Sequence, residues 1–207
     1  FDLRREDVNA ADDHHIVAPR PDAVDPAGLH YWDSWKDSDR GEASAYRESI
    51  YPRAAQVVLE ILEKEGRSLA PGSSILDIFG GDGEFLKILF SAMSAESGLR
   101  PVLIDANEKS LEKAEANLSN FPDKRIIPLN IRDLKKFREV LAEIHPRIVT
   151  SIGGINHMVT NSKIARGVVE AVYDTLPEGG YFLVTGVTES HLNASDFKKV
   201  GFDVLNM

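Results

Sequence analysis

The chain contains no cysteine among its 207 residues. This absence excludes disulfide bonds, thiolate nucleophiles and zinc sites with cysteine ligands. No hydrophobic run reaches the length of a membrane-spanning helix, and no segment resembles a signal peptide. Lysine and arginine (24) are fewer than aspartate and glutamate (33), so the net charge is −9. Because an acidic surface disfavours non-specific binding to nucleic acid or anionic membranes, we expect neither partner. With no cysteine in the chain, we expect the cytoplasm as the default location.

Hydrophobic residues make up 43% of the chain, which is ordinary for a globular protein. From residue 74 onward, short apolar runs alternate with stretches of helical period. This alternation predicts right-handed βαβ units and an α/β fold, a doubly wound, mostly parallel sheet with helices on both faces. The predicted strands cover residues 74–79, 102–105, 125–129, 147–152, 181–185 and 201–207, and the helices between them cover 82–95, 108–118, 135–144 and 164–176.

The first 65 residues have a different character. Prolines at positions 19, 21 and 26 disfavour a regular element, so residues 1–41 are interpreted as an extended arm. Residues 42–65 are predicted to be helical, with a break or kink at Pro52. The chain therefore divides into an N-terminal arm with a helical cap, residues 1–65, and an α/β domain, residues 66–207.

Both tryptophans, Trp32 and Trp35, lie in this arm. Aromatic side chains in a polar segment must cover something, and these either pack on the domain or form the roof of a pocket. His14 and His15 stand beside two aspartates, and these residue types can bind a metal. An irregular arm does not hold such ligands in a fixed geometry, so we predict no metal site.

A glycine-rich turn follows the strand predicted at residues 74–79. Asp77 stands near the end of that strand, and Gly80, Gly81 and Gly83 follow directly before a helical stretch. In a strand, glycine turn and helix, the backbone approaches a nucleotide-like ligand closely and the helix N-terminus faces it. Ligands of such sheets bind at the carboxyl ends of the strands, where strand order reverses, so we expect this strand to lie at that point.

A dinucleotide site is one interpretation of the turn. Its fingerprint has glycines at the first, third and sixth positions, but Leu86 occupies the sixth position here. The carboxylate of Asp77 would also repel a pyrophosphate. A carboxylate at this strand end is better suited to a cationic or zwitterionic ligand, such as a sulfonium.

The glycine turn and the strand end before it resemble the first motif of the class I, Rossmann-like S-adenosylmethionine-dependent methyltransferases. Asp77, Gly81 and Gly83 match the motif, and Phe79 stands where the first glycine is usual. Asp105 ends the next strand, where the family places the acidic residue that holds both ribose hydroxyls. The resemblance implies S-adenosylmethionine as cofactor and S-adenosylhomocysteine as product. It also implies a seventh, antiparallel strand, and hence a sheet of six or seven strands.

The resemblance implies further cofactor contacts from the segments that follow the later strands. Asn130 stands where the family usually has an acidic residue that contacts adenine, and its carbonyl can still accept from the adenine amino group. Tyr46 and Tyr51, before the first strand, either close over the cofactor or serve ordinary packing. The predicted cofactor-binding residues are Asp77, Phe79, Gly80, Gly81, Gly83, Asp105, Ala106, Asn107, Asn130, Ile131, Arg132, Ser151, Ile152, Gly153, Tyr46 and Tyr51.

The catalytic candidates follow the fourth predicted strand. Methyl transfer requires donor and acceptor to be held in line, with a base where the acceptor is a poor nucleophile. The resemblance implies that the acceptor meets the methyl group above the end of the fourth strand. The topology places His157, with Asn156, at this edge, and histidine is a residue type that can serve as a base near neutral pH. Alternatively, both residues cap the following helix or line the pocket. The segment lacks the Asn/Asp-Pro-Pro-Tyr/Phe sequence of enzymes that methylate exocyclic amino groups.

The predicted function is S-adenosylmethionine-dependent methyl transfer to a small-molecule acceptor, bound between the cap and the carboxyl ends of the strands. A protein or peptide methyltransferase is one alternative. A nucleotide-dependent oxidoreductase and a non-catalytic S-adenosylmethionine-binding module are two others. The assembly, monomer or homodimer, stays open.

Overall fold

The structure, a computed structural model, describes residues 48, 50–64, 72–93, 98–155, 159, 161–185 and 192–204. The chain divides into two units, Phe1–Tyr46 and Arg47–Met207. All described residues belong to the second unit. The arm, both tryptophans, the His14–His15 pair and Tyr46 therefore lie outside the described residues, and the domain boundary at residue 65 stays a prediction.

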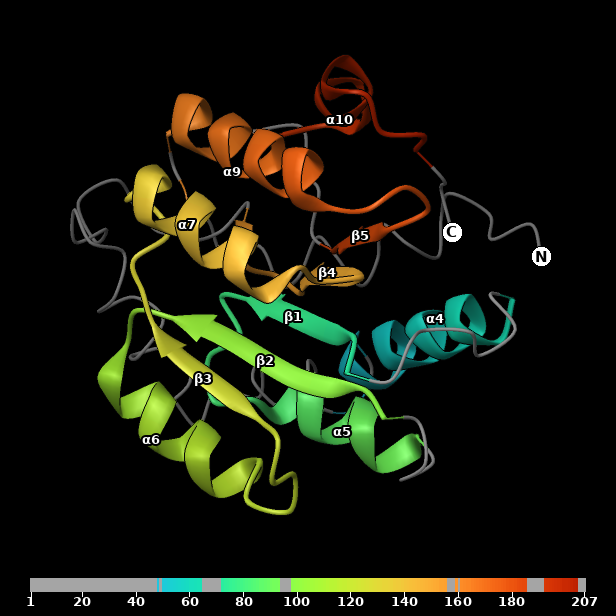
Figure 1. Cartoon of the computed structure of the whole chain (residues 1–207), viewed down its shortest axis with the longest axis vertical. Coiled ribbons are helices and arrows are strands. Elements are labelled where there is room, and N and C mark those ends of the chain that lie inside the picture. The colour runs from blue at the N-terminus through green and yellow to red at the C-terminus, as the bar shows by residue number, and fades with distance from the viewer. Residues whose placement is uncertain are drawn as a thin grey trace. The chain divides into compact units, whose positions relative to one another are not determined.

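Five parallel strands form one sheet in the order β3-β2-β1-β4-β5 (Figure 1). This arrangement confirms the predicted α/β fold with a parallel sheet. The described residues contain five strands, however, rather than the six or seven expected, because Gly201 to Val204 form a turn and irregular backbone. The strands are β1 (Ser74–Ile78), β2 (Arg100–Asp105), β3 (Arg125–Pro128), β4 (Ile148–Ser151) and β5 (Tyr181–Val184).

Helices cover both faces of the sheet, with α7 and α9 on one side and α5 and α6 on the other (Figure 1). Strand residues alternate between the two layers. Leu76 and Ile78 belong, with Phe137 of α7 and Val168 of α9, to the main apolar cluster of the described residues. The helices are α4 (Tyr51–Lys64), α5 (Glu84–Ala92), α6 (Glu108–Asn117), α7 (Leu134–Ile144), α9 (Ser162–Thr175) and α10 (Ala194–Val200). None of these helices combines the length and the apolar character needed to cross a membrane.

Strand β1 lies at the centre of the sheet, between β2 and β4. The chain proceeds from β1 through β2 to β3 in one direction, and then crosses back past β1 to β4 and β5. Strand order therefore reverses at the carboxyl end of β1, which confirms the position expected from the sequence. In the register, Asp77 lies between Leu103 and Thr150.

The helix before the sheet changes geometry beside Pro52. Glu48 and Ile50 are π-helical, and the regular α-helix α4 begins at Tyr51. Proline has no N–H to donate to the preceding turn, so it interrupts the regular pattern of helical hydrogen bonds at this point. The change coincides with the break or kink predicted from the sequence. Helix α4 then buries residues such as Val58 and Leu62, and it packs against α5.

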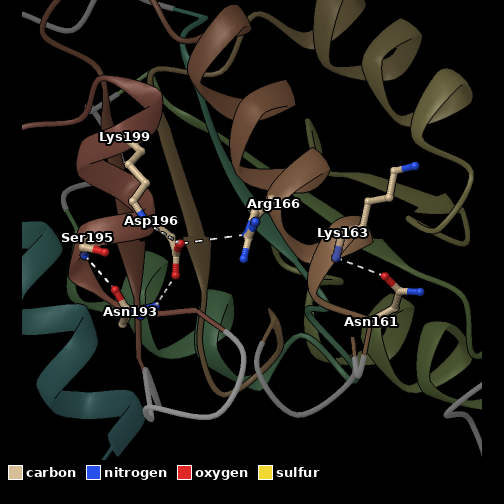
Figure 2. Close-up of polar contacts among 7 residues, drawn as sticks. All are labelled: Asn161, Lys163, Arg166, Asn193, Ser195, Asp196 and Lys199. Atoms are coloured by element: carbon tan, nitrogen blue, oxygen red, sulfur yellow. Dashed lines mark hydrogen bonds and ion pairs between the residues drawn. The ribbon is translucent and has the colours of Figure 1, made fainter.

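Helix α10 was not expected from the sequence. Its start is a capping box, in which Asn193 Oδ1 accepts from the backbone N–H of Ser195 at 2.9 Å and Asp196 Oδ2 accepts from the backbone N–H of Asn193 at 3.1 Å. Lys199 Nζ at 3.5 Å and Arg166 Nε of α9 at 3.8 Å lie beside Asp196 Oδ1 (Figure 2). The spacing of Asn193 and Asp196 was the sequence signal for this helix.

The segment after α10 packs as an aromatic cluster instead of beginning the predicted sixth strand. Phe202 has its ring centroid 5.0 Å from that of Tyr173, 6.0 Å from that of Phe182 and 6.2 Å from that of Phe197. These contacts attach the segment to α9, β5 and α10. The end of the predicted strand, 205–207, lies outside the described residues.

Removal of the capping carboxylate in Asp196→Ala should lower the free energy of unfolding by about 1 kcal/mol at pH 7. The backbone N–H of Asn193 lowers the pKa of Asp196 most, burial opposes this effect, and Lys199 and Arg166 add to the lowering. The stabilisation is therefore present above the ordinary carboxyl pKa of 3.8 and is lost as pH falls through the lower pKa of the folded state.

Urea unfolding of the wild-type chain and of Asp196→Ala between pH 7 and pH 2.5 measures the difference in their free energies of unfolding. The control is Asp203→Ala, which removes an exposed carboxylate just beyond the helix. A stability difference for Asp196→Ala that stays constant down to the lowest pH would contradict the assigned role of the carboxylate.

Candidate functional site

The turn between β1 and α5 follows a defined backbone path. Phe79, Gly81 and Gly83 all have positive φ, at 60°, 54° and 74°. The backbone N–H of Gly80 donates to Ile104 O of β2 at 3.2 Å, and the N–H of Gly83 donates to Gly80 O at 2.9 Å. The turn is thus fixed against the neighbouring strand before α5 begins.

At two of the turn glycines, close packing leaves little space for a side chain. A Cβ at Gly80 would lie 2.7 Å from Leu103 Cγ and 3.0 Å from Asp77 Oδ2. At Gly83, where φ is positive, a Cβ would lie 3.3 Å from Leu118 Cδ1. Without side chains at these positions, the backbone of the turn lies directly against β2 and α6. Packing within the protein therefore accounts for these two glycines, and the close approach of the turn to a ligand stays a prediction.

The carboxylate of Asp105 joins the turns that follow β1 and β2. Its Oδ2 accepts from the backbone N–H of Gly81 at 2.9 Å, and its Oδ1 accepts from the backbone N–H of Asn107 at 2.9 Å. Asp105 is 8% exposed, and half-buried Ala106 separates it from Asn107 in the sequence. Each carboxylate oxygen has capacity for more than one donor, so these contacts are compatible with the predicted binding of ribose hydroxyls. The sequence did not reveal the bond to Gly81.

Asp77 lies at the point where strand order reverses. It is 2% exposed, and its Oδ1 accepts from the hydroxyl of Thr150 on β4 at 2.8 Å. Sequence reasoning missed Thr150, because its importance comes only from its register opposite Asp77. Asp82, 4% exposed, accepts from the backbone N–H of Glu84, the first residue of α5, at 3.3 Å.

Three buried carboxylates therefore surround the glycine turn, those of Asp77, Asp82 and Asp105. The described contacts include, for each of them, a hydrogen bond accepted from a backbone N–H or a hydroxyl. The arrangement gathers acidic side chains at the carboxyl ends of β1 and β2. Such a region favours a ligand that carries positive charge and disfavours a pyrophosphate.

The predicted adenosine residues have structural roles as well. Asn107 is buried and caps α6 by accepting from the backbone N–H of Ser110 at 3.0 Å. Asn130 is exposed, and its Oδ1 accepts from the backbone N–H of Arg132, itself half-buried, at 3.0 Å. Ile131 is 2% exposed and packs in the main apolar cluster. The structure thus places these residues at the carboxyl edge of the sheet, with Ile131 facing the core.

The loop after β4 is held from two sides. The hydroxyl of buried Ser151 accepts from the backbone N–H of Ile155 at 3.0 Å. The backbone N–H of Gly153 donates to Thr185 Oγ1, just after β5, at 2.9 Å. Ile152 lies between them and is 5% exposed. These contacts bring the predicted residues Ser151, Ile152 and Gly153 to the same edge as Asp77.

The two catalytic candidates, Asn156 and His157, lie outside the described residues, so their roles stay predictions. Tyr51, one of the two predicted cofactor-covering tyrosines, is 7% exposed, and its ring centroid lies 6.1 Å from that of Phe85 on α5. This contact is the packing alternative that the sequence left open for it.

Comparison with known proteins identifies the fold. No protein-family model and no curated protein matches the sequence. The CurJ carbon methyltransferase matches with a TM-score of 0.57 and 14% identity, over 93% of this chain and 58% of that one. An S-adenosylmethionine-dependent methyltransferase from Clostridium acetobutylicum matches with a TM-score of 0.52 and 19% identity, over 69% of this chain and 55% of that one.

This chain has the fold of the class I S-adenosylmethionine-dependent methyltransferases. CalS10, an amino pentose methyltransferase from Micromonospora echinaspora solved with S-adenosylmethionine bound, gives a TM-score of 0.50 and 20% identity, over 69% of this chain and 54% of that one. The chain spans between 54% and 58% of the length of these three structures. The resemblance seen in the sequence is confirmed at the level of the fold.

Replacement of Thr150 by the isosteric valine should lower the free energy of unfolding by about 1–3 kcal/mol, because it removes a hydroxyl donor from the buried carboxylate of Asp77. Denaturant unfolding at pH 7 measures the loss. Thr175→Val is the matched control, since Thr175 Oγ1 bonds only one turn back on α9, to Ala171 O at 2.8 Å. Equal effects of the two substitutions would contradict the role assigned to Thr150.

Proposed function

We propose that this chain binds S-adenosylmethionine at the carboxyl ends of β1 and β2 and transfers its methyl group to a small molecule. The observation that carries the proposal is the carboxylate of Asp105. It lies at the end of β2, directly beside the glycine turn, and bonds to Gly81 N at 2.9 Å. A ligand bound along the backbone of the turn therefore lies next to this carboxylate, which can accept hydrogen bonds from two vicinal hydroxyls.

The charge of the site favours this cofactor over a dinucleotide. The three buried carboxylates around the turn attract a sulfonium and an ammonium group, and both occur in S-adenosylmethionine. A pyrophosphate in the same place would meet Asp77 and Asp82. The nucleotide-dependent oxidoreductase is therefore the weaker alternative.

The chemistry requires little more than position. Bound S-adenosylmethionine supplies an electrophilic methyl carbon and a neutral thioether as leaving group. The chain has to orient that methyl toward an acceptor, exclude water and receive a proton where the acceptor carries one. We propose that Ser151, the last residue of β4, and the loop of residues 152–155 border this position. His157, two residues beyond, is the proposed base, with Asn156 beside it.

A small-molecule acceptor is supported by the acidic composition of the chain, which disfavours nucleic acid. The structural neighbours include a carbon methyltransferase and an amino pentose methyltransferase. We propose that residues 1–65 cover the acceptor. A protein or peptide acceptor and a non-catalytic binding module are the alternatives, and the second of these predicts binding without turnover.

Titration calorimetry with S-adenosylmethionine and with NAD tests the cofactor. The wild-type chain should bind the first and not the second, and Asp105→Asn should weaken binding by more than about tenfold because one carboxylate oxygen becomes a donor. The control is Asp174→Asn near the end of α9, which removes an exposed carboxylate paired with Arg138 at 2.6 Å. Binding of NAD without binding of S-adenosylmethionine would contradict the proposed cofactor. Unchanged affinity in Asp105→Asn would contradict the role proposed for Asp105.

The proposed base is tested by His157→Ala with a panel of phenol, amine and carboxylic acid acceptors. Release of S-adenosylhomocysteine should fall by about 10²-fold or more for acceptors that must lose a proton, while the affinity for S-adenosylmethionine stays the same. His145→Asn is the control, because His145 is an exposed histidine with φ 47° at the end of α7, a conformation that asparagine tolerates. Normal turnover of His157→Ala would leave His157 with the capping or lining role.

A further inference from the structure

Phe79 occupies an unusual position in the glycine turn. It stands where the resembling motif has its first glycine, and it adopts the backbone conformation typical of glycine, with φ 60°. Bulky residues are rare in this left-handed region and persist only where the surrounding structure holds them. Phe79 is half-buried and packs against the main apolar cluster.

The glycine missing from the turn has a counterpart on the neighbouring strand end. A Cβ at Gly154, in the loop after β4, would lie 2.6 Å from Phe79 Cβ, 2.9 Å from Cδ2 and 3.0 Å from Cγ. The closest atom is Phe79 Cβ, which is fixed to the backbone, so rotation of the ring cannot relieve this overlap. Phe79 and Gly154 are therefore complementary in shape, because the Phe79 side chain of the turn occupies the space that a side chain at Gly154 of the loop would need.

This pair joins the two segments that matter for the reaction. On one side, the turn continues to Gly81, whose N–H bonds to Asp105. On the other side, Gly154 lies in the loop that Ser151 and Thr185 hold from the sheet. The Phe79 side chain fills the space between the turn proposed to bind the cofactor and the loop proposed to face the acceptor.

We infer that Phe79 is a positioning residue, whose side chain, seated on Gly154, fixes the spacing between the cofactor turn and the loop after β4. The inference rests on the proposed function, since the turn has to hold S-adenosylmethionine for this spacing to act on it. A purely structural contact would affect folding alone. A positioning contact also changes cofactor affinity, and it does so non-additively when both partners change.

A double-mutant cycle of Phe79→Gly, Gly154→Ala and the combined variant tests the inference by titration calorimetry with S-adenosylmethionine. Gly154→Ala should weaken binding by about tenfold, because the new methyl group displaces Phe79 and with it the turn. Phe79→Gly alone should weaken binding by only about threefold, because glycine accepts the same φ while the loop loses its support. The combined variant should bind as Phe79→Gly does, since the collision is gone.

Gly180→Ala is the matched control. A Cβ there would lie 2.9 Å from Pro177 O, so the substitution also forces a backbone shift, but in the turn that precedes β5 at the opposite edge of the sheet. It should lower the unfolding temperature and leave S-adenosylmethionine affinity unchanged. Equal losses of affinity in Gly180→Ala and Gly154→Ala would overturn the positioning role.

The cycle separates failure of the inference from failure of the proposed function. If the wild-type chain binds S-adenosylmethionine and the two losses of affinity multiply in the combined variant, the positioning role is wrong and the cofactor assignment stands. If the wild-type chain does not bind S-adenosylmethionine, the proposed function fails and the positioning role fails with it. If Gly154→Ala does not fold, recovery of folding and binding in the combined variant supports the inference, and a combined variant that also fails overturns it.

Discussion

The carboxylate of Asp105 is the constraint on which the rest of the site depends. By accepting from the backbone of Gly81 and of Asn107, each at 2.9 Å, it fixes the glycine turn to the end of β2. The turn has few side chains to hold it, and buried backbone donors need partners. Asp105 therefore organises the backbone of the turn, and it is one of the three buried carboxyl groups around that turn.

The same edge of the sheet brings together groups that have no local relation in the sequence. Asp77 is bonded to Thr150 across the point of strand reversal, and Phe79 fits against Gly154 beside it. Negative charge and close backbone packing are thus concentrated where β1, β2 and β4 end. This arrangement is consistent with a cationic cofactor at the ends of β1 and β2 and an acceptor over the end of β4.

Much of the fold was predictable because the hydrophobic period is a local property. The alternation of apolar runs and helical stretches gave the five observed strands and the helices between them to within a few residues. The predicted sixth strand was wrong for the described residues 201–204, where Phe202 packs against Tyr173 and Phe182 instead. Helix α10 was missed because it is short, although Asn193 and Asp196 carry its capping signal.

By itself, the sequence determined the α/β class, the glycine turn and the identity of the two carboxylates that end β1 and β2. Only the tertiary structure decided what these carboxylates contact, since the bonds from Gly81 to Asp105 and from Thr150 to Asp77 depend on the register between strands distant in sequence. It also gave a reason for Phe79, because the space that its side chain needs is provided by Gly154, 75 positions later in the chain. Local patterns specify elements, whereas complementary shape and hydrogen bonding across the sheet arise only when the elements are packed.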